Sequence, residues 1–356
     1  MNISRNRSAG SAFIALAAIG TVFLPAAIAS EEGMFAADQV SELSYDDFMA
    51  NWLYTHVGDD RGPTGPEHDM ARDNIASLME GYGLTVELEA FQYWGETWHN
   101  VVGTKVGTVY PDQEYIIGAH YDSVSNPGAD DNASGVALVL EAARIITQYD
   151  SQYTIRFIAF DMEETGLNGS EAYVDDHYTD DILGMISADM VAYDTGTNEC
   201  NIYGRSASNP IKNTVADAVS EYGDGLTPVI GGDTPYSDHA PFESAGFQAC
   251  LFIEREVWNN PFYHTQDDNY ENPDNLNFPY AVKMTRSIVG WLVDEAGVLV
   301  EMNECPADFD GDGDVDTADL LFLLSAWGTG DGDIDGDGDT DTADLLELLA
   351  AWGECP

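Results

Sequence analysis

The chain has 356 residues, 44% of them hydrophobic, which allows one large α/β domain with a small appendage and argues against wholesale disorder. Its 64 acidic residues outnumber 12 basic ones, giving a formal net charge of −52. So acidic a surface repels nucleic acid and anionic membranes, suits cations and a salty medium, and otherwise serves solubility.

Residues 1–29 are predicted to be a signal peptide. Two arginines supply the positive start, an apolar stretch follows, and an A-x-A cleavage site ends at Ala29. The alternative is a transmembrane anchor, but the stretch is short and Pro25 interrupts it. No later segment is apolar enough to span a bilayer. We therefore expect a secreted protein without a membrane span, either released or held at the cell surface.

Strand-like and helix-like stretches alternate over the larger domain, which we expect at 30–299. Helices are predicted at 40–58, 66–83, 135–148, 209–222 and 278–296, and strands at 101–105, 115–119, 154–160, 183–187, 200–203 and 249–254. This alternation predicts an α/β fold, with a mostly parallel central sheet and helices on both faces. Ligands of such sheets bind beyond the carboxyl ends of the strands, which is where the polar clusters of this sequence fall.

A linker at 300–304 separates this domain from a second one at 305–356. There the pattern from Asp308 to Asp319 returns 25 residues later, from Asp333 to Asp344, and each copy precedes a Leu-rich helix. Alternating Asp side chains supply the hard oxygen donors that Ca²⁺ prefers, and the Gly residues between them permit a tight loop. The candidate ligands of two calcium ions are Asp308, Asp310, Asp312, Asp314, Asp316, Asp319, Asp333, Asp335, Asp337, Asp339, Asp341 and Asp344.

The four cysteines can form disulfides in an exported protein. Cys305 and Cys355 bracket the acidic tail and are the natural pair. Cys200 and Cys250 lie in predicted strands, where a disulfide and two buried free thiols are equally consistent with the sequence.

Polar residues follow three of the predicted strands. His120 ends the first, and Asp122 is placed to orient its imidazole. Asp131 lies in a Gly-rich segment that opens a helix, and the two oxygens of one carboxylate can bridge two metal ions. Glu163 and Glu164 follow a buried strand. Neighbouring glutamates in different environments can divide the work, one binding metal and the other taking a proton from water.

Two further residues complete this set. Asp189 ends another apolar strand, and His264 follows the last strand in a loop. Taken singly, each residue of the set has an ordinary explanation as a helix cap, a solvated turn or a surface histidine. Together, two histidines and three carboxylates with one spare glutamate form a consistent ligand set for a two-zinc site.

In order and combination these motifs resemble the di-zinc aminopeptidase family of bacterial leucyl aminopeptidases, whose relatives include glutamate carboxypeptidases and glutaminyl cyclases. The resemblance covers residues 40–297, including the segment 237–242 near the family's substrate pocket. It implies the following zinc ligands: His120, Asp131, Glu164, Asp189 and His264. Asp131 would bridge two zinc ions, His120 and Asp189 would bind one of them, and Glu164 and His264 the other.

The resemblance also implies the catalytic roles. Glu163 would be the general base that deprotonates the shared water, and Asp122 would support His120. Tyr263 lies where some members use a tyrosine to steady the tetrahedral oxyanion. The implied activity is that of a secreted zinc-dependent exopeptidase, an aminopeptidase acting on the N-terminal residues of peptides. Alternatives are a glutaminyl cyclase-type acyltransferase and a non-catalytic surface protein with a vestigial peptidase domain.

The duplicated tail resembles a type I dockerin, a small all-α calcium-binding domain that docks onto cohesin modules. The Asp at the twelfth position of each loop, where an EF-hand has Glu, fits dockerins. The resemblance implies a cohesin-like partner. The alternative is a structural calcium module that has no partner.

Overall fold

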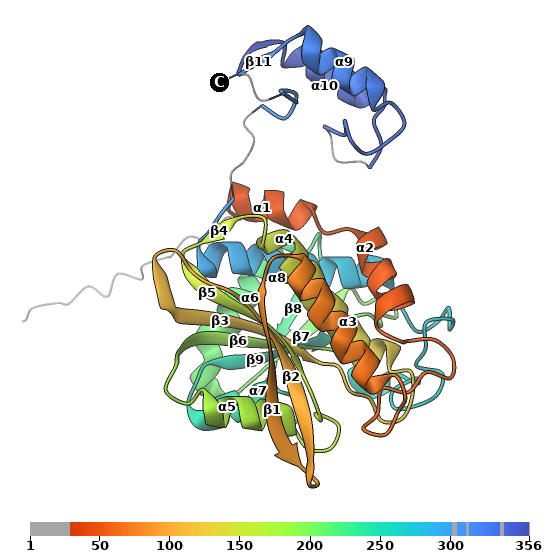
Figure 1. Cartoon of the computed structure of the whole chain (residues 1–356), viewed down its shortest axis with the longest axis vertical. Helices are drawn as coiled ribbons and strands as arrows, with labels where there is room; N and C mark the ends of the chain where they lie inside the picture. The colour runs from red at the N-terminus through yellow and green to blue at the C-terminus, as the bar shows by residue number, and fades with distance from the viewer. Residues whose placement is uncertain (1–28, 301–304, 311–312, 335–337, 356) are drawn as a thin grey trace, which may run out of the picture.

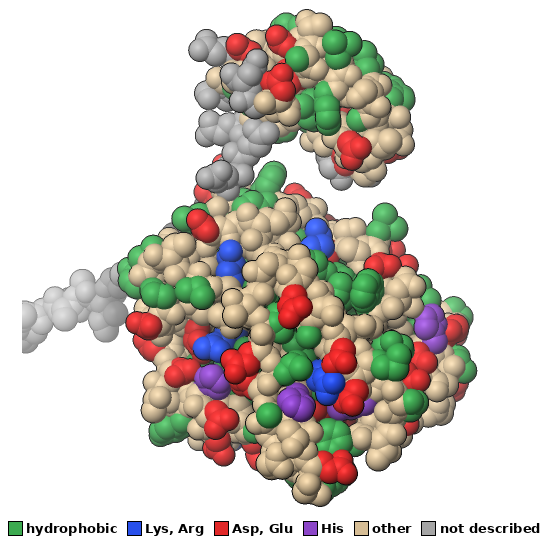
Figure 2. All heavy atoms as spheres, viewed as in Figure 1, with side chains coloured by type: hydrophobic (Ala, Val, Ile, Leu, Met, Phe, Trp, Pro, Cys, Tyr) green, Lys and Arg blue, Asp and Glu red, His purple; other side chains and the backbone are tan. Residues whose placement is uncertain are grey.

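The computed structural model describes residues 29–300, 305–310, 313–334 and 338–355 (Figure 1). Nearly all of the predicted signal peptide and linker lies outside these residues. Within them, no helix combines the length and the apolar character needed to cross a bilayer. Asp and Glu side chains are spread over the face drawn in Figure 2, where Lys and Arg are few, as the composition requires.

An eight-stranded sheet forms the centre of the larger domain (Figure 1). Its strand order is β1 (Thr85–Tyr93), β2 (Glu96–Lys105), β5 (Tyr153–Phe160), β3 (Tyr110–His120), β6 (Asp181–Asp189), β9 (Ala249–Glu254), β7 (Glu199–Tyr203) and β8 (Thr227–Ile230). The four central strands β5, β3, β6 and β9 run parallel. Antiparallel pairs occur toward the edges, at β1–β2, β2–β5 and β7–β9. The predicted α/β fold is confirmed.

Helices cover both faces of this sheet (Figure 1). The larger layer contains α1 (Glu31–Asp38), α2 (Glu42–Asp47), α3 (His68–Gly81), α4 (Gly135–Ile146), α6 (Asn209–Tyr222) and α8 (Phe278–Ala296). The opposite layer contains α5 (Asn168–Asp176) and α7 (His239–Ala245). The remaining short elements are η1 (Phe48–Trp52), η2 (Ala129–Ser134), η3 (Ser206–Ser208), η4 (Val257–Asn259), β4 (Asp150–Ser151) and β10 (Val298–Leu299).

Strand β5 shows why its sequence is apolar almost throughout. Ile155 and Phe157 pack into the core beneath the larger helical layer, whereas Ile158 and Phe160 pack against α5 and α7. Successive side chains of a strand point to opposite faces, so a strand covered on both faces needs apolar residues at nearly every position. This burial fixes the register of the strand and leaves its carboxyl end as the first place where polar side chains can gather.

All six predicted strands and all five predicted helical regions are found, but the sequence left some elements unrecognised: α1, β1, α5, α7 and β8. The edge strand β1 is mostly exposed and rich in polar residues, so it lacks the apolar run that marks a central strand. The predicted helix at 40–58 is shorter in the structure, where α2 and η1 together end at Trp52.

The described part of the tail contains the helices α9 (Thr317–Ser325) and α10 (Thr342–Ala350) and a two-stranded ladder of β11 (Asp314–Val315) with β12 (Gly353–Glu354). Val315, Leu323 and Leu348 form the centre of its small core. The predicted disulfide between Cys305 and Cys355 is confirmed, with the two Cα atoms 5.7 Å apart. It closes the tail on itself.

Cys200 and Cys250 are buried free thiols. Cys200 on β7 pairs with Glu254 on β9, which is four residues along that strand from Cys250. At the usual rise of a strand, four residues separate the two cysteines by roughly 13 Å, which is too far for a disulfide. Burial raises the pKa of both thiols, which keeps them protonated.

Candidate active site

The candidate zinc ligands gather at the carboxyl ends of the central strands. His120 is the last residue of β3, and Asp189 is the last residue of β6. Glu164 lies in the turn after β5, Asp131 lies in η2 before α4, and His264 lies in the loop after β9. The fold therefore brings together all five residues whose pattern predicted a metal site.

Asp131 lies between the two histidines. Its Oδ1 is 3.4 Å from Nε2 of His120, and that nitrogen is 3.7 Å from Oδ1 of Asp189. The other oxygen of Asp131, Oδ2, is 3.0 Å from Nε2 of His264. The same nitrogen of His264 is 3.3 Å from Oε2 of Glu164. Each oxygen of Asp131 thus faces a separate pair of side chains, as a bridging carboxylate must.

These buried carboxylates suit a divalent cation. Within the described residues, none of the carboxylates of Asp131, Glu164 and Asp189 forms an ion pair with Lys or Arg. Oε1 of Glu164 is buried without a hydrogen-bond partner, and burial raises the pKa of Glu164 to about 8. Buried unpaired carboxylates are costly unless they are protonated or bind metal. Two imidazoles and three carboxylates are donors that Zn²⁺ accepts.

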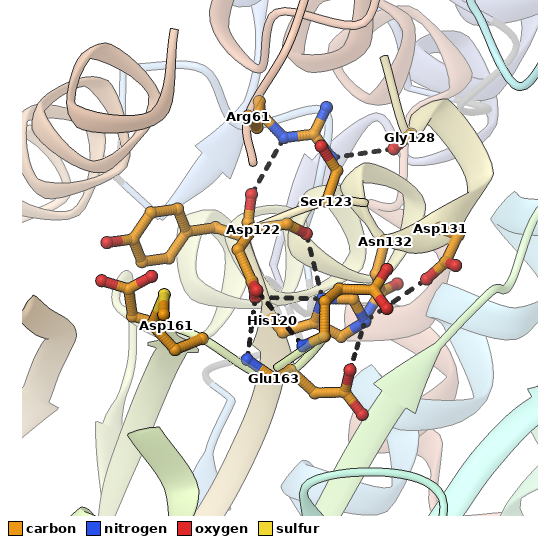
Figure 3. Close-up of polar contacts among 12 residues, drawn as sticks. Arg61, His120, Asp122, Ser123, Gly128, Asp131, Asn132, Asp161 and Glu163 are labelled. Atoms are coloured by element: carbon orange, nitrogen blue, oxygen red, sulfur yellow. Dashed lines mark hydrogen bonds and ion pairs between the residues drawn. The ribbon is translucent and has the colours of Figure 1, made fainter. Parts of the chain in front are cut away.

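Asp122 connects His120 to the glutamate pair (Figure 3). Its backbone oxygen lies 3.1 Å from Nδ1 of His120, where it can accept a hydrogen bond from that nitrogen and leave Nε2 free for metal. Its carboxylate accepts hydrogen bonds from the backbone N–H of Glu163 (3.1 Å) and Glu164 (3.2 Å). Asp122 therefore positions the glutamate turn as well as the imidazole.

Glu163 faces the same space as the first ligand group. Its Oε2 is 4.0 Å from Nε2 of His120, and its side chain is mostly buried. Burial raises the pKa of Glu163 well above its usual range, and the neighbouring carboxylates of Asp238 and Asp189 add to the rise, which His120 opposes. The geometry also places Glu163 with His120 and Asp189 as three side chains able to share one ion.

Tyr263 lies beside the second ligand group. Its ring stacks on His264 with centroids 3.8 Å apart, and 41% of the residue is exposed. Burial raises the pKa of Tyr263, and the carboxylates of Asp131 and Glu164 raise it further. The phenol therefore remains protonated and can donate a hydrogen bond into the site.

Comparison with known proteins identifies the family. The model for Peptidase family M28 matches residues 100–286, more than half of the chain. The chain belongs to peptidase family M28. Aminopeptidase YwaD of Bacillus subtilis is 36% identical to it over 222 residues, which cover 58% of this chain and 47% of YwaD. The chain thus spans about half the length of that relative.

Two solved structures place the M28 domain among known folds. The zinc aminopeptidase BSAP from Bacillus subtilis is 29% identical with a TM-score of 0.52, over 58% of this chain and 51% of that one. A glutaminyl cyclase from Bacteroides thetaiotaomicron, bound to N-acetylhistamine, is 20% identical with a TM-score of 0.61, over 72% of this chain and 99% of that one. At this lower identity the second likeness shows the fold alone.

Sequence reasoning missed a layer of buried polar residues behind the ligands of the M28 site. Arg61 is 1% exposed and donates hydrogen bonds to the backbone oxygens of Tyr54, Tyr121, Pro127 and Gly128. These bonds hold the segment that runs from His120 to Asp131 (Figure 3). A single arginine in a Gly- and Pro-rich turn gives no signal in the sequence that it will be buried.

Asp268 supports the bridging residue from behind. Its carboxylate accepts hydrogen bonds from the backbone N–H of Asp130 (2.7 Å) and Asp131 (3.1 Å), and from Nδ2 of Asn275 (2.8 Å). Asp268 is 1% exposed. Its position four residues after His264 is the only hint that the sequence offered.

Asp130 and Glu254 tie together three loops of the M28 site. The carboxylate of Asp130 accepts hydrogen bonds from Ala192 N (3.0 Å) and from Nδ2 of Asn260 (3.0 Å). Asn260 also donates to Glu254 (3.2 Å), whose other oxygen accepts from Tyr193 N (3.0 Å). These hydrogen bonds fix the loops that follow β6 and β9 to η2. The ligands next to these segments are therefore held in place relative to one another.

A cavity opens from the ligand cluster. Its apolar lining is formed by Met190, Tyr203, Leu251, Ile253 and Val257, and its aromatic rim by Tyr236, Trp258 and Tyr263. None of the described residues that line it is Lys or Arg. No residue of the segment 237–242, which we expected near the substrate, is among the described lining residues, and Asp238 and His239 are fully buried.

The two repeats of the tail make matching contacts where the structure describes them. Asp316 and Asp341 cap the starts of α9 and α10. The backbone N–H of Asp316 donates a hydrogen bond to the carboxylate of Asp319 (2.8 Å). In the second repeat, the N–H of Asp341 donates to Asp344 in the same way (2.7 Å). Carboxylate oxygens of Asp308, Asp310 and Asp319 lie close enough to share one ion. Asp312, Asp335 and Asp337 lie outside the described residues.

Proposed function

We propose that the chain is a secreted zinc-dependent exopeptidase, an aminopeptidase that removes N-terminal residues from peptides. The observation that carries this proposal is the bridging position of Asp131 between two His–carboxylate groups, with Glu163 beside them, in a chain of family M28. The names of two similar proteins, an aminopeptidase and a zinc aminopeptidase, support it.

We assign two zinc ions to this site. His120 and Asp189 would hold one, Glu164 and His264 the other, and Asp131 would contact both. When bound, zinc polarises a substrate carbonyl and lowers the pKa of a water molecule. The buried and unpaired Oε1 of Glu164 supports a ligand role, because such an oxygen otherwise loses its solvation without compensation.

The protein's own residues supply proton transfer and orientation. Glu163 takes a proton from the attacking water and returns it to the leaving amine, a task that its place beside His120 and Asp189 allows. Asp122 holds the backbone of Glu163 through a 3.1 Å hydrogen bond, which limits its movement between these steps. The hydroxyl of Tyr263 donates to the oxyanion that develops on the carbonyl.

The charge of the cavity favours an aminopeptidase over a carboxypeptidase. A free α-amine is positive and is attracted by the carboxylates of Glu163, Glu164 and Asp189. A C-terminal carboxylate would need a cationic partner, and no described residue that lines the cavity is Lys or Arg. The same charge pattern leaves the glutaminyl cyclase alternative open, because the substrate of that reaction also carries a free α-amine.

The test compares a leucyl anilide with an N-terminal glutaminyl peptide, before and after zinc removal. We expect zinc-dependent release of the anilide, and a loss of about 10²–10⁴-fold in kcat for Glu163→Gln with its zinc retained. Near-normal turnover by that variant would refute the role of Glu163. Cyclisation of the glutaminyl peptide without anilide release would identify a cyclase, and a purified chain with little zinc would indicate a vestigial site.

We also propose that the mature protein begins at Ser30. In support, Ser30 is well anchored: its Oγ accepts a hydrogen bond from Gly33 N (2.9 Å) at the start of α1 and donates to Asp294 (2.6 Å). Its backbone N lies 2.9 Å from the hydroxyl of Tyr222. Cleavage after Ala29 would create an α-ammonium beside this hydroxyl and close to Asp294. Mass spectrometry of the secreted protein tests the cleavage site.

For the tail we propose two calcium ions and docking onto a cohesin-like module. The support is a duplicated apolar surface in which residues 25 apart are similarly exposed: Leu321 and Leu346 (63% and 63%), Leu324 and Leu349 (48% and 49%), Trp327 and Trp352 (45% and 47%). Calcium-dependent capture by an immobilised cohesin module tests the docking. Calcium binding without capture would identify a structural module instead.

A further inference from the structure

A second hollow adjoins the cavity that contains the ligand cluster. Its volume is about 440 Å³, and it shares Glu163, Glu164, Tyr236, Trp258 and Tyr263 with the inner cavity. The remaining lining is Gly166, Leu167 and Pro235. The glutamate pair therefore lies at the junction of two hollows, and three aromatic side chains form the wall between them.

We propose that this outer hollow binds the second residue of the substrate, and that Tyr236 and Trp258 make it selective for an apolar or aromatic side chain there. The proposal rests on the aminopeptidase function argued above. It adds a preference that the inner cavity cannot impose, because the inner cavity faces only the residue that is removed.

The position of the glutamates sets the direction of the substrate. The bond that is cut must lie within reach of Glu163, at the junction of the hollows. The N-terminal side chain then occupies the inner cavity, where Met190 and Leu251 offer an apolar surface. The peptide that continues beyond the cut bond must leave through the outer hollow. A third hollow of about 500 Å³ shares Leu167 and Pro235 with it and extends this path for longer peptides.

The two aromatic rings are largely open to solvent. Tyr236 is 68% exposed and Trp258 is 66% exposed, and their rings meet edge to face with centroids 6.0 Å apart. Ring faces left open beside a hollow can be covered by a substrate side chain. Covering them buries apolar area, and an aromatic partner adds an edge-to-face contact of its own.

The charge of the outer hollow also favours an apolar second residue. Among its described lining residues none is Lys or Arg, and its only acids are Glu163 and Glu164. An Asp or Glu as second residue would bring a negative charge close to these carboxylates without a cationic partner. A Phe or Leu in that position meets Leu167, Pro235 and the two rings instead.

The experiment compares kcat/KM of the zinc-loaded full chain for Leu-Phe-amide, Leu-Gly-amide, Leu-Asp-amide and Leu-amide. We expect the wild type to prefer Leu-Phe-amide over Leu-Gly-amide by about tenfold, and Leu-Asp-amide to be the poorest dipeptide. Trp258→Ala should remove most of the preference for Phe over Gly, chiefly through KM. Trp258→Phe should retain most of it.

Trp94 provides the matched control. It is also 66% exposed and stacks on a tyrosine, but it lies in the β1–β2 hairpin and lines neither hollow. Trp94→Ala should keep the wild-type preference. An unchanged Phe-to-Gly ratio in Trp258→Ala, or an equal loss in Trp94→Ala, would overturn the proposed subsite while Leu-amide is still cleaved. Failure of the wild type to cleave Leu-amide as well would overturn the aminopeptidase proposal itself.

Discussion

Replacing Asp268 by Asn tests whether the buried layer behind the ligands positions the metal site. Oδ1 of Asp268 accepts two hydrogen bonds, from Asp130 N and from the Asn275 side chain, and Oδ2 accepts one from Asp131 N. In Asp268→Asn the best orientation keeps the oxygen on the first two donors. The new NH₂ group then faces the backbone N–H of Asp131, which loses its acceptor.

The cost of this change follows from the three bonds. A buried donor left without an acceptor costs about 1–3 kcal/mol, and each of the two remaining bonds weakens by roughly 1 kcal/mol when its acceptor becomes neutral. We expect the variant to lose about 3–5 kcal/mol of unfolding free energy, which lowers Tm by roughly 5–10 °C. Because the displaced N–H belongs to Asp131, zinc affinity should also fall by about 10–100-fold.

The assay is thermal unfolding in zinc and in chelator, with a zinc titration at pH 8. Burial raises the pKa of Asp268 to about 6, so the wild-type carboxylate is ionised at that pH. Asp267→Asn is the matched control, because it makes the same charge change at an exposed neighbour. A purely structural role would lower Tm equally with and without zinc. Wild-type zinc affinity in Asp268→Asn would refute the positioning role.

Three further predictions concern the metals and pH. His120→Ala and His264→Ala should each lower zinc from about two ions per chain toward one; two ions retained in either variant would contradict that ligand assignment. The full chain should bind about two Ca²⁺, and removal of Ca²⁺ by dialysis with zinc kept present should unfold the tail helices by Asp–Asp repulsion while peptide hydrolysis persists; unchanged circular dichroism would argue against this. Burial lowers the pKa of His239 to about 4. Because the unfolded histidine titrates near pH 6.5, the unfolded state binds the proton and stability should fall between about pH 6.5 and 4. His239→Gln should remove this part of the pH dependence of the unfolding free energy, which denaturation at several pH values measures.

The sequence predicted the centre of the fold and the candidate ligands for the same physical reason. A strand buried on both faces must be apolar throughout, so its end is visible as the first polar residue, and His120 and Asp189 occupy such ends. Parallel strands then bring their ends to one edge of the sheet, and Asp131 and His264 lie in loops that reach that edge.

What the sequence could not show depends on partners that are distant along the chain. Arg61 and Glu254 are buried because other loops supply their hydrogen bonds, whereas a charged residue in a turn or at a strand end ordinarily meets water. The register of β7 against β9 decided that Cys200 and Cys250 stay apart, and composition carries no information about register. The edge strand β1 was missed because it lacks an apolar run.

Five buried carboxylates at the site divide into two groups by the partners they have. Those of Asp122 and Asp268 accept backbone N–H bonds, so they are satisfied by the folded chain itself. Those of Asp131, Glu164 and Asp189 have, among the described residues, only imidazole partners and one another. The folded chain supplies hydrogen bonds that offset the desolvation of the first group. The second group keeps excess negative charge, because the chain has few cations. For these five residues, that difference distinguishes the two that hold the loops of the site in place from the three that we propose as metal ligands.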